Sequence, residues 1–292
     1  MKDYNLKPDS EYGFLQIDPT PSKDEIAAYY AEEFYASENP AQVNDSSLDV
    51  QERDKQFYDS WRTDIRLIIE SEIKKDNISI YDFGCGWCES LTYFNQFGYE
   101  CFGIDTAPEA IEHGKNKGFN VEVSDLVDIN PFERRFDVVM MQNVLEHLAS
   151  PKETVKKIYN DVLAYGGLLI IDVPNEFNIF QTVGCEVNNL SEWWVAPPAH
   201  LNYFSVSTLR ALLIGEGFSI VEELASFPLE MFLLMGDNYV GNPELGRVCH
   251  VKRMQFEDSL RKTGKTAVLH ELYRNFAKQN LGRQILMIAK KG

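Results

Sequence analysis

An acidic residue followed by two glycines one residue apart is the pattern in this sequence with the most chemical content. Asp82 follows the apolar residues 78–81, and Gly84 and Gly86 come directly after it. Such a run predicts a buried strand, and the glycines predict a tight turn that opens a helix. Glycine lets the backbone approach a ligand closely, and a helix N-terminus offers free N–H groups. The turn therefore indicates a binding site for a nucleotide-type cofactor.

A second acidic residue follows the next predicted strand. Residues 99–104 end at Asp105, about 20 residues after the glycine turn, which is the spacing of a ribose-binding acid. A carboxylate at this position can accept hydrogen bonds from both ribose hydroxyls. Thr106 and Glu109 predict the cap of the following helix. Asp105 therefore either binds a ribose or caps this helix, and the glycine turn favours the ribose.

The spacing of the glycines argues against a nicotinamide dinucleotide. That fingerprint has a third glycine three residues after the second one. Here this position is Glu89, and its carboxylate would repel a pyrophosphate. We therefore place a nicotinamide enzyme last among the alternatives.

Instead, the turn resembles motif I of the class I S-adenosylmethionine-dependent methyltransferases, with Cys88 where that family often has a third glycine. The segment 142–148, with its Glu-His pair at Glu146 and His147, resembles motif IV of the same family. The resemblance implies S-adenosylmethionine as the cofactor. It also implies that Asp125 binds the adenine amino group and that Leu126 packs on the adenine ring. Alternatively, Asp125 is a solvated acid in a loop. The expected cofactor residues are Asp82, Gly84, Gly86, Trp87, Asp105, Thr106, Asp125, Leu126, Gln142 and Asn143.

Two histidines are candidates for the catalytic base. A sulfonium methyl is already activated, so transfer mainly requires positioning and the exclusion of water. An oxygen or protonated-amine acceptor must also lose a proton, and imidazole changes its charge near neutral pH. His147 lies in the predicted motif IV, and His200 lies on a later loop. Alternatively, His147 only positions a helix and His200 bonds to a backbone carbonyl. No cluster with metal-ligand spacing is apparent, and we expect no metal.

A segment rich in aromatic side chains follows the fifth predicted strand. Residues 174–206 are expected to be an irregular acceptor loop, because long loops at strand ends usually carry function. Trp193, Trp194 and Tyr203 are the expected substrate-binding residues, since aromatic walls exclude water and attract a sulfonium by cation–π contact. For the tryptophans, packing of the loop itself is an equal alternative.

Strand and helix patterns alternate along the chain at the interval of βαβ units. They predict an α/β fold: a doubly wound, mainly parallel, seven-stranded sheet of the Rossmann-like methyltransferase type. Residues 78–292 should form this domain, with a helical insertion at 227–281 before the last strand, which is expected at 283–289. The insertion is expected to form either a wall of the acceptor pocket or the surface of a homodimer.

Residues 1–77 are expected to form a helical lid. A capping box at Ser22 and Glu25 begins one helix, which continues through Ile26, Tyr29, Tyr30 and Phe34, and a second helix spans 57–69. Ser150 and Glu153 form a similar box further on, and Ser207 is expected to cap a later helix. Gly166 and Gly167 are expected to form a turn before the fifth strand, at 168–173. Arg62 either reaches the carboxylate of the cofactor or is a surface arginine, and we favour the surface.

Composition excludes several classes of function. The chain has 292 residues, 44% of them hydrophobic, and a net charge of −17, which disfavours nucleic acid and anionic membranes as partners. No secretory leader and no apolar run of the ~20 residues needed to span a bilayer are evident. The five cysteines include a Cys85-x-x-Cys88 pair, but a second pair for zinc is missing, and we expect reduced thiols in a cytosolic protein.

These observations predict a methyltransferase acting on a small polar acceptor. The overall pattern resembles methyltransferases of bacterial surface-sugar and secondary-metabolite pathways, which implies O-methylation of a sugar or sugar-nucleotide-like metabolite. Two alternatives stay open. One is N-methylation of an amino sugar or another small metabolite, and the other is a non-catalytic protein that binds the cofactor as a sensor or partner subunit.

Overall fold

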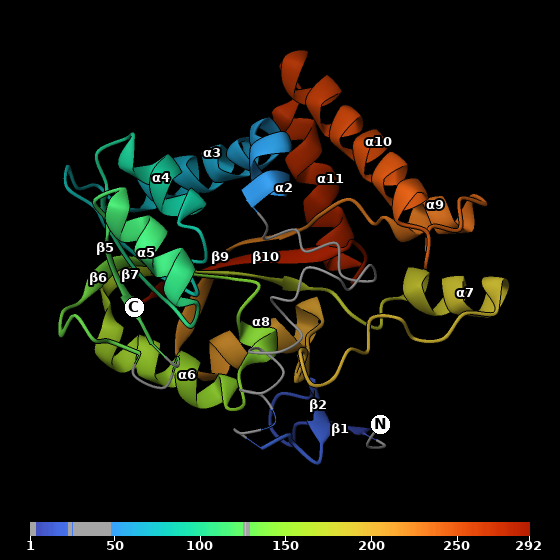
Figure 1. Cartoon of the computed structure of the whole chain (residues 1–292), viewed down its shortest axis with the longest axis horizontal. Coiled ribbons are helices and arrows are strands. Elements are labelled where there is room, and N and C mark those ends of the chain that lie inside the picture. The colour runs from blue at the N-terminus through green and yellow to red at the C-terminus, as the bar shows by residue number, and fades with distance from the viewer. Residues whose placement is uncertain (1–3, 23–24, 26–47, 125, 127–128) are drawn as a thin grey trace.

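The computed structural model describes residues 4–22, 25, 48–124, 126 and 129–292. A seven-stranded sheet runs through the centre of this part of the chain (Figure 1), with strand order β5-β4-β3-β6-β7-β10-β9. The predicted α/β fold with a mainly parallel sheet is confirmed. The strands are β3 (Ser79–Phe83), β4 (Glu100–Asp105), β5 (Asn120–Val123), β6 (Phe136–Gln142), β7 (Leu163–Pro174), β9 (Phe218–Ala225) and β10 (Gln284–Lys291).

The order of the strands reverses next to β3. Strands β5, β4, β3, β6 and β7 pair in parallel, whereas β10 is antiparallel to both β7 and β9. In open parallel sheets ligands bind at the carboxyl ends of the strands beside such a reversal. The ends of β3, β4 and β6 are therefore the expected place for the cofactor. Gly166 and Gly167, expected as a turn before the fifth strand, lie within β7 instead.

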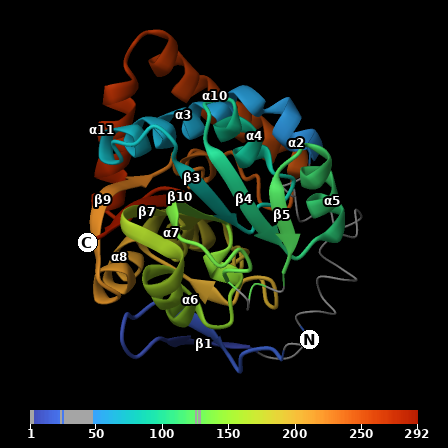
Figure 2. The same cartoon turned by 90° about the vertical axis from the view of Figure 1, so that its left-hand side faces the viewer.

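Helices cover both faces of the sheet (Figure 2). Alternate residues of β3 face opposite sides: Ile80 belongs to one hydrophobic cluster, and Tyr81 and Phe83 belong to another. The cluster around Ile80 contains side chains from α3, α4, α5 and α11, and the other contains side chains from α6 and α8. The bounds are α3 (Lys55–Glu72), α4 (Glu89–Asn95), α5 (Pro108–Asn116), α6 (Pro151–Lys157), α8 (Val206–Gly215) and α11 (Thr266–Lys278).

The first residues of the N-terminal segment form strands and not helices. Strand β1 (Asn5–Pro8) pairs with β2 (Leu15–Asp18), and β2 pairs with β8 (Asn202–Tyr203), which gives a small three-stranded antiparallel sheet. Phe14 packs against Phe204, with ring centroids 4.9 Å apart. The helical expectation for residues 1–77 was wrong here, because these strands depend on a partner far along the chain.

In other parts of residues 1–77 the structure agrees with the predictions from the sequence. The backbone N–H of Glu25 donates to Ser22 Oγ at 3.2 Å, and that of Ser22 donates to Glu25 Oε2 at 2.9 Å, so the capping box is present. The helix through Ile26, Tyr29, Tyr30 and Phe34 lies outside the described residues. Helix α2 (Leu48–Arg53) precedes α3, which contains the helix predicted at 57–69.

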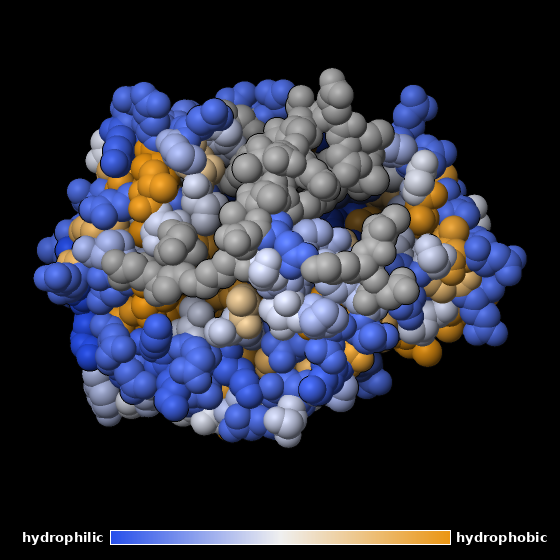
Figure 3. All heavy atoms as spheres, turned by 60° about the horizontal axis from the view of Figure 1, so that its bottom comes forward, coloured by the Kyte–Doolittle hydropathy of each residue, from blue (hydrophilic) through white to orange (hydrophobic). Residues whose placement is uncertain are grey.

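Residues 174–206 are more ordered than predicted. Helix α7 (Ile179–Asn188) begins at Asn178, whose side chain forms a capping box with Gln181. The box was readable in the sequence but was overlooked. Hydrophobic side chains gather at the right of Figure 3, the side where Figure 1 places α7; this helix exposes Ile179 and Val187.

Three predicted helix caps were wrong. Helix α8 is capped by Ser205, with Thr208 completing its capping box, and not by Ser207. Ala107 and not Thr106 is the N-cap of α5. Ser150 does precede α6, but its side chain makes no capping hydrogen bond. Each error is a displacement of one or two residues, or a missing side-chain bond, at a helix whose existence was predicted.

The insertion before the last strand is helical, as predicted. It contains α9 (Glu230–Leu234), α10 (Pro243–Lys262) and α11. Arg261 on α10 donates to both carboxylate oxygens of buried Asp64 on α3, and His270 on α11 lies 3.0 Å from the same carboxylate. The insertion is thereby joined to the N-terminal helices. A homodimer through this insertion stays a prediction.

Within the described part of the chain, no helix combines the length and the apolar character needed to cross a bilayer.

Candidate cofactor and active site

The glycine turn after β3 leaves room for a ligand. Gly84 has φ +84°, and a Cβ there would lie 2.4 Å from a methyl carbon of Val144. Gly86 has φ +47°, but a Cβ there would meet nothing within 4 Å. Gly84 is therefore required by packing as well as by conformation, whereas the space beside Gly86 is open to an approaching molecule.

Asp105 connects this turn with the next strand. Its Oδ2 accepts a hydrogen bond from the backbone N–H of Gly86 at 2.8 Å, and its Oδ1 accepts one from Ala107 at 2.9 Å. The capping alternative is thus partly realised, since Asp105 does bind the start of α5. Each carboxylate oxygen can accept a further bond. Asp105 therefore retains the capacity to receive two ribose hydroxyls.

Asp82 is a buried acid next to this turn. Its side chain is 3% exposed, and Oδ1 has no hydrogen-bond partner among the described residues. Burial, and secondarily the charge of Asp105, raise the pKa of Asp82 to about 8, although Arg62 opposes the shift. A cationic ligand such as an ammonium or a sulfonium would compensate both the burial and the repulsion. The residues therefore fit a cofactor that carries positive charge.

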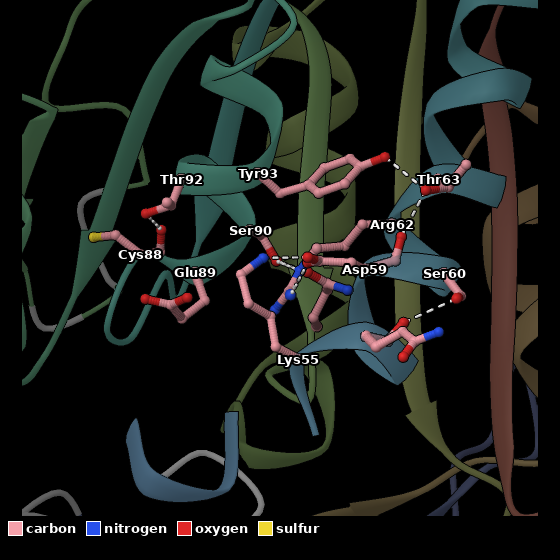
Figure 4. Close-up of polar contacts among 12 residues, drawn as sticks. Lys55, Asp59, Ser60, Arg62, Thr63, Cys88, Glu89, Ser90, Thr92 and Tyr93 are labelled. Carbon is pink, nitrogen blue, oxygen red and sulfur yellow. Dashed lines mark hydrogen bonds and ion pairs between the residues drawn. The ribbon is translucent and has the colours of Figure 1, made fainter. Parts of the chain in front are cut away.

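Arg62 is buried and not on the surface, which corrects the interpretation that we favoured from the sequence. It is 8% exposed, and it extends from α3 toward the start of α4 (Figure 4). Its Nη1 donates to Asp59 at 2.9 Å and its Nε to Ser90 at 3.4 Å, and Ser90 donates to Gln142 at 2.8 Å. Arg62 and Gln142, which are far apart in the sequence, are thus connected through Ser90 next to the glycine turn, and no local pattern reveals this connection.

The remaining predicted cofactor residues occupy varied environments. Trp87 is partly exposed and packs edge-on against His113, and Thr106 is exposed. Leu126 has φ +62° and packs partly against the core, while Asp125 lies outside the described residues. Asn143 is exposed, and it accepts a hydrogen bond from Gln284 at 2.8 Å.

The Cys85–Cys88 pair lies inside the turn. Both thiols are buried and free, and their sulfurs are 3.9 Å apart. Gly103 makes room for Cys85, because a Cβ on that glycine would come within 2.8 Å of the cysteine side chain. Hydrogen bonding with Cys88, together with burial, raises the pKa of Cys85 well above its ordinary value. These thiols therefore fill space, as the geometry of the turn suggested.

The two candidate histidines, from distant parts of the chain, lie next to each other. His147 is in the short helix η2 (Leu145–His147) after β6, and its ring centroid is 5.0 Å from that of His200. His147 Nδ1 donates to the carbonyl of Ala199 at 2.7 Å, so the unprotonated nitrogen is Nε2. His147 Nε2 lies 3.7 Å from Oε1 of Glu146.

Burial keeps both imidazoles uncharged near neutral pH. It lowers the pKa of His200 to about 3, with a smaller contribution from His147. It also lowers the pKa of His147, despite the bond to Ala199. Burial raises the pKa of Glu146 to about 8. Burial therefore weakens both imidazoles as bases, and the bond to Ala199 opposes this effect at His147.

The predicted substrate aromatics lie in a hydrophobic cluster beside the small N-terminal sheet. Trp194 is 4% exposed and contacts Trp193 edge-on, with centroids 4.8 Å apart. Tyr203 is 2% exposed, and its hydroxyl donates to the carbonyl of His200 at 3.2 Å. Trp194 and Tyr203 pack with Ile17 of β2. Their burial fits the alternative in which they hold the loop in place and so position His200.

Three acids near the histidines were not singled out in the sequence. Asp172 lies two residues before the end of β7, Glu176 follows this strand, and Glu230 begins α9. Burial raises the pKa of Asp172 and that of Glu176 to about 7 each. Asp172 Oδ1, Glu146 Oε2 and Glu230 Oε2 are buried without a hydrogen-bond partner among the described residues. The position of Asp172 at a strand end was the one available signal.

Comparison with known proteins agrees with this geometry. The sequence model of a family described as "Methyltransferase domain" matches residues 51–223, more than half of the chain. The matched range includes the glycine turn, Asp105 and the two histidines. A search of curated proteins found no match.

Solved structures share the fold at low sequence identity. A chain from the complex of the Haloferax volcanii Trm112 methyltransferase activator with a methyltransferase is 17% identical, with a TM-score of 0.52 over 93% of this chain and 99% of that one. An Archaeoglobus fulgidus SAM-dependent methyltransferase is 21% identical, with a TM-score of 0.51 over 82% and 98%. The plantazolicin methyltransferase BamL, solved with SAH and a triazolic desmethylPZN analog, is 17% identical, with a TM-score of 0.52 over 84% and 89%. The family match together with the Rossmann-like fold leads to one conclusion: the chain belongs to the methyltransferase domain family and is a methyltransferase with S-adenosylmethionine as its cofactor.

Proposed function

We propose that this enzyme methylates a hydroxyl group of a small polar acceptor, with a sugar or sugar-nucleotide-like metabolite as the preferred class. The observation that carries the proposal is a set of buried acceptor oxygens on Glu146, Asp172 and Glu230 that have no hydrogen-bond partner within the described part of the chain. A buried polar atom without a partner costs free energy, which a ligand rich in hydroxyl donors would recover. A sugar ring offers several such donors.

The cofactor end of the site is assigned to the glycine turn. Asp105 would accept the ribose hydroxyls, and Arg62 would meet the carboxylate of the methionine moiety. Asp82, whose Oδ1 has no partner among the described residues, would compensate the charge of the ammonium group. Gln142, bonded to Ser90, would line the same region. When bound, S-adenosylmethionine supplies a methyl group already activated by its sulfonium, so these residues need only hold and orient it.

The histidine pair is assigned to the acceptor end. His147 and His200 lie after β6 and before β8, next to the buried acids. Uncharged His147 presents the lone pair of Nε2, which can take the proton from an acceptor hydroxyl. In this proposal the aromatic residues Trp193, Trp194 and Tyr203 support the side of the acceptor site that carries the histidines. Residues 1–77 would act as a lid over the site.

A transfer assay with labelled methyl donor tests the proposal. Neutral sugars, nucleotide sugars, amino sugars, phenols and simple amines would be offered in parallel, and products located by mass spectrometry. Label on a sugar oxygen supports the proposal, whereas label confined to phenols or lipids contradicts it. Asp172→Asn should raise the KM for the true acceptor more than it lowers kcat, because the substitution removes a carboxylate oxygen that accepts hydrogen bonds. Glu192→Gln, on the neighbouring surface, serves as a matched control.

N-methylation is the second candidate, favoured by the same buried carboxylates. Glu146, Asp172 and Glu176 would also attract an ammonium group, as on an amino sugar. The two candidates differ in one measurement. An amine must reach the enzyme with its lone pair free, so the rate with a low-pKa amine should exceed that with a more basic analogue at pH 7.

A further inference from the structure

We propose that Glu146, His147 and His200 form a binding site for a divalent transition-metal ion. One potential ligand atom of each residue lies within 4.8 Å of those of the other two. The sequence did not indicate this site, because α6, β7 and α7 separate His200 from the Glu-His pair along the chain. The fold brings the three side chains to the same point after β6.

Glu146 is a buried carboxylate that the described protein groups leave partly unsatisfied. The residue is 2% exposed, and its Oε2 has no hydrogen-bond partner within the described part of the chain. Its Oε1 is 3.7 Å from His147 Nε2, which is beyond hydrogen-bond distance. His200 Nδ1 is also buried without a hydrogen-bond partner among those residues. An ion bound here would give Glu146 Oε2 and His200 Nδ1 a partner.

The ligands are held by a rigid set of surrounding contacts. The bond from His147 Nδ1 to the carbonyl of Ala199 fixes the tautomer in which Nε2 carries the lone pair. Such second contacts orient the histidines of metal sites. The backbone N–H of Leu201 donates to the carbonyl of Glu146 at 2.8 Å, so the two ligand segments are joined directly.

A buried asparagine strengthens this junction. Asn202 is 1% exposed, and its Nδ2 donates to the carbonyl oxygens of Leu148, Leu145 and Glu146 at 2.7, 3.2 and 3.3 Å. One amide group thus holds the turn that carries Glu146 and His147 against the strand that follows His200. The three ligands are preorganised relative to one another, which a purely structural loop would not require.

The donor set selects the type of ion. Two imidazole nitrogens and one carboxylate suit Zn²⁺, Co²⁺, Mn²⁺ or Fe²⁺, whereas Mg²⁺ and Ca²⁺ prefer oxygen ligands throughout. A carboxylate and two imidazoles bind a cation in their deprotonated, neutral-imidazole forms, so binding of the ion would release the proton that burial favours on Glu146. Three protein ligands leave coordination positions open, as in catalytic and not structural zinc sites.

The site has a role in the proposed function, and this step rests on that proposal. An acceptor hydroxyl that occupies an open position on the ion would lose its proton more readily, because a bound cation lowers the pKa of a coordinated oxygen. His147 and His200 would then act as ligands, and the proton would leave through solvent or a neighbouring carboxylate such as Asp172. Metal binding itself does not depend on this step.

Metal titration of the full-length protein tests the proposal. Protein freed of metal by a chelator would be dialysed against Zn²⁺ or Co²⁺, and bound metal measured by mass spectrometry. We expect one ion per chain and, with Co²⁺, visible absorption bands of nitrogen-oxygen coordination. Glu146→Gln and His200→Ala should each weaken binding by about tenfold or more. His250→Ala, which removes a partly buried histidine on α10, should leave binding unchanged.

The outcomes separate this proposal from the proposed function. Wild-type protein that binds no stoichiometric Zn²⁺ or Co²⁺, or that binds it as tightly after Glu146→Gln and His200→Ala, overturns the metal site. O-methylation that persists in chelator would then leave the proposed function standing with His147 as its base. Stoichiometric metal binding without methylation of any hydroxyl would support the site and reject the proposed acceptor. Circular dichroism of each variant checks that the fold is retained.

Discussion

Asp105 accepts a hydrogen bond at 2.8 Å from the backbone N–H of Gly86, which joins the end of β4 to the turn after β3. The acid therefore orders the glycine turn and, at the same time, faces the region in which a ribose would lie. Ordering the turn in advance lowers the entropic cost of binding a ligand there. The same bond makes Asp105 the most informative residue for testing the cofactor site.

Asp105→Asn should weaken binding of S-adenosylhomocysteine by about 10- to 100-fold, since hydrogen bonds to a charged group contribute about 1.5–3 kcal/mol. Calorimetry with the purified variant measures this directly. Glu100→Gln is the matched control, because Glu100 begins the same strand at the opposite edge and pairs with exposed Arg134. Equal affinities of the Asp105 variant and the wild type would remove Asp105 from the cofactor site.

The two glycines of the turn should respond differently to alanine. Gly84→Ala combines a positive φ, which costs about 1 kcal/mol, with a clash against Val144, which adds about 1–3 kcal/mol. Gly86→Ala carries the strain alone, and its methyl group enters the open space. We expect a large loss of stability in the first and mainly a loss of cofactor affinity in the second, measured by denaturation and calorimetry. Equal stability losses would contradict the geometry.

Arg62→Met should weaken binding of ligands that carry a carboxylate. Affinity for S-adenosylhomocysteine should fall about tenfold or more, whereas affinity for methylthioadenosine, which lacks the amino-acid moiety, should change little. Arg66→Met controls for the loss of an arginine from the same helix, because Arg66 pairs with Glu70 on the outer side. A parallel loss for both ligands would assign Arg62 to structure alone.

Asp82 should make stability depend on pH. Its pKa in the folded protein is about 8, against about 3.9 unfolded. Between these values the folded state holds a proton that the unfolded state has lost, so stability falls as the pH rises. Asp82→Asn should therefore lose less stability than wild type between pH 5 and 8, as followed by urea denaturation without cofactor. A pH dependence identical to that of wild type would show that Asp82 is not protonated in the folded state.

The ion pair between α3 and the insertion should contribute to stability at neutral pH. Burial alone would raise the pKa of Asp64, but bonds from His270 and Arg261 outweigh it and lower the pKa below its ordinary value. Its contribution is thus present above about pH 4 and is lost as the pH falls through the folded-state pKa. Asp64→Asn should cost about 3 kcal/mol at pH 7.

Urea denaturation at pH 7 and in acid would measure this difference, which should shrink at low pH. Asp258→Asn is the control, because Asp258 forms an exposed pair with Lys262 that contributes below about 1 kcal/mol. A similar loss of unfolding free energy in both variants would indicate that the buried ion pair contributes no more to stability than the exposed pair.

Much of the sheet could be predicted because its signals are local. The apolar runs, the acids at their ends and the positive-φ glycines at 84 and 86 all act within a few residues of each other. The cofactor edge follows, since parallel strands bring Asp82 and Asp105 to the same side. The helical insertion was recognised for the same reason, from its periodicity.

The features that were missed depend on partners distant in sequence. Strands β1 and β2 form only because β8 continues their sheet. The burial of Arg62 results from Ser90 on another helix, and the grouping of Glu146 with His200 results from the bonds of Asn202. No local pattern contains these relationships.

The position of β10 between β7 and β9 has a consequence for the synthesis of the chain. Strands β7 and β9 cannot be bridged until residues 284–291 have emerged from the ribosome, because among the described strands β10 is the one that pairs with both of them. Until then the long, apolar β7 presents an open edge to other molecules, the kind of edge that promotes aggregation. A stop codon before residue 284 would therefore be expected to yield insoluble protein, even though every residue of the glycine turn and of the histidine pair would be present.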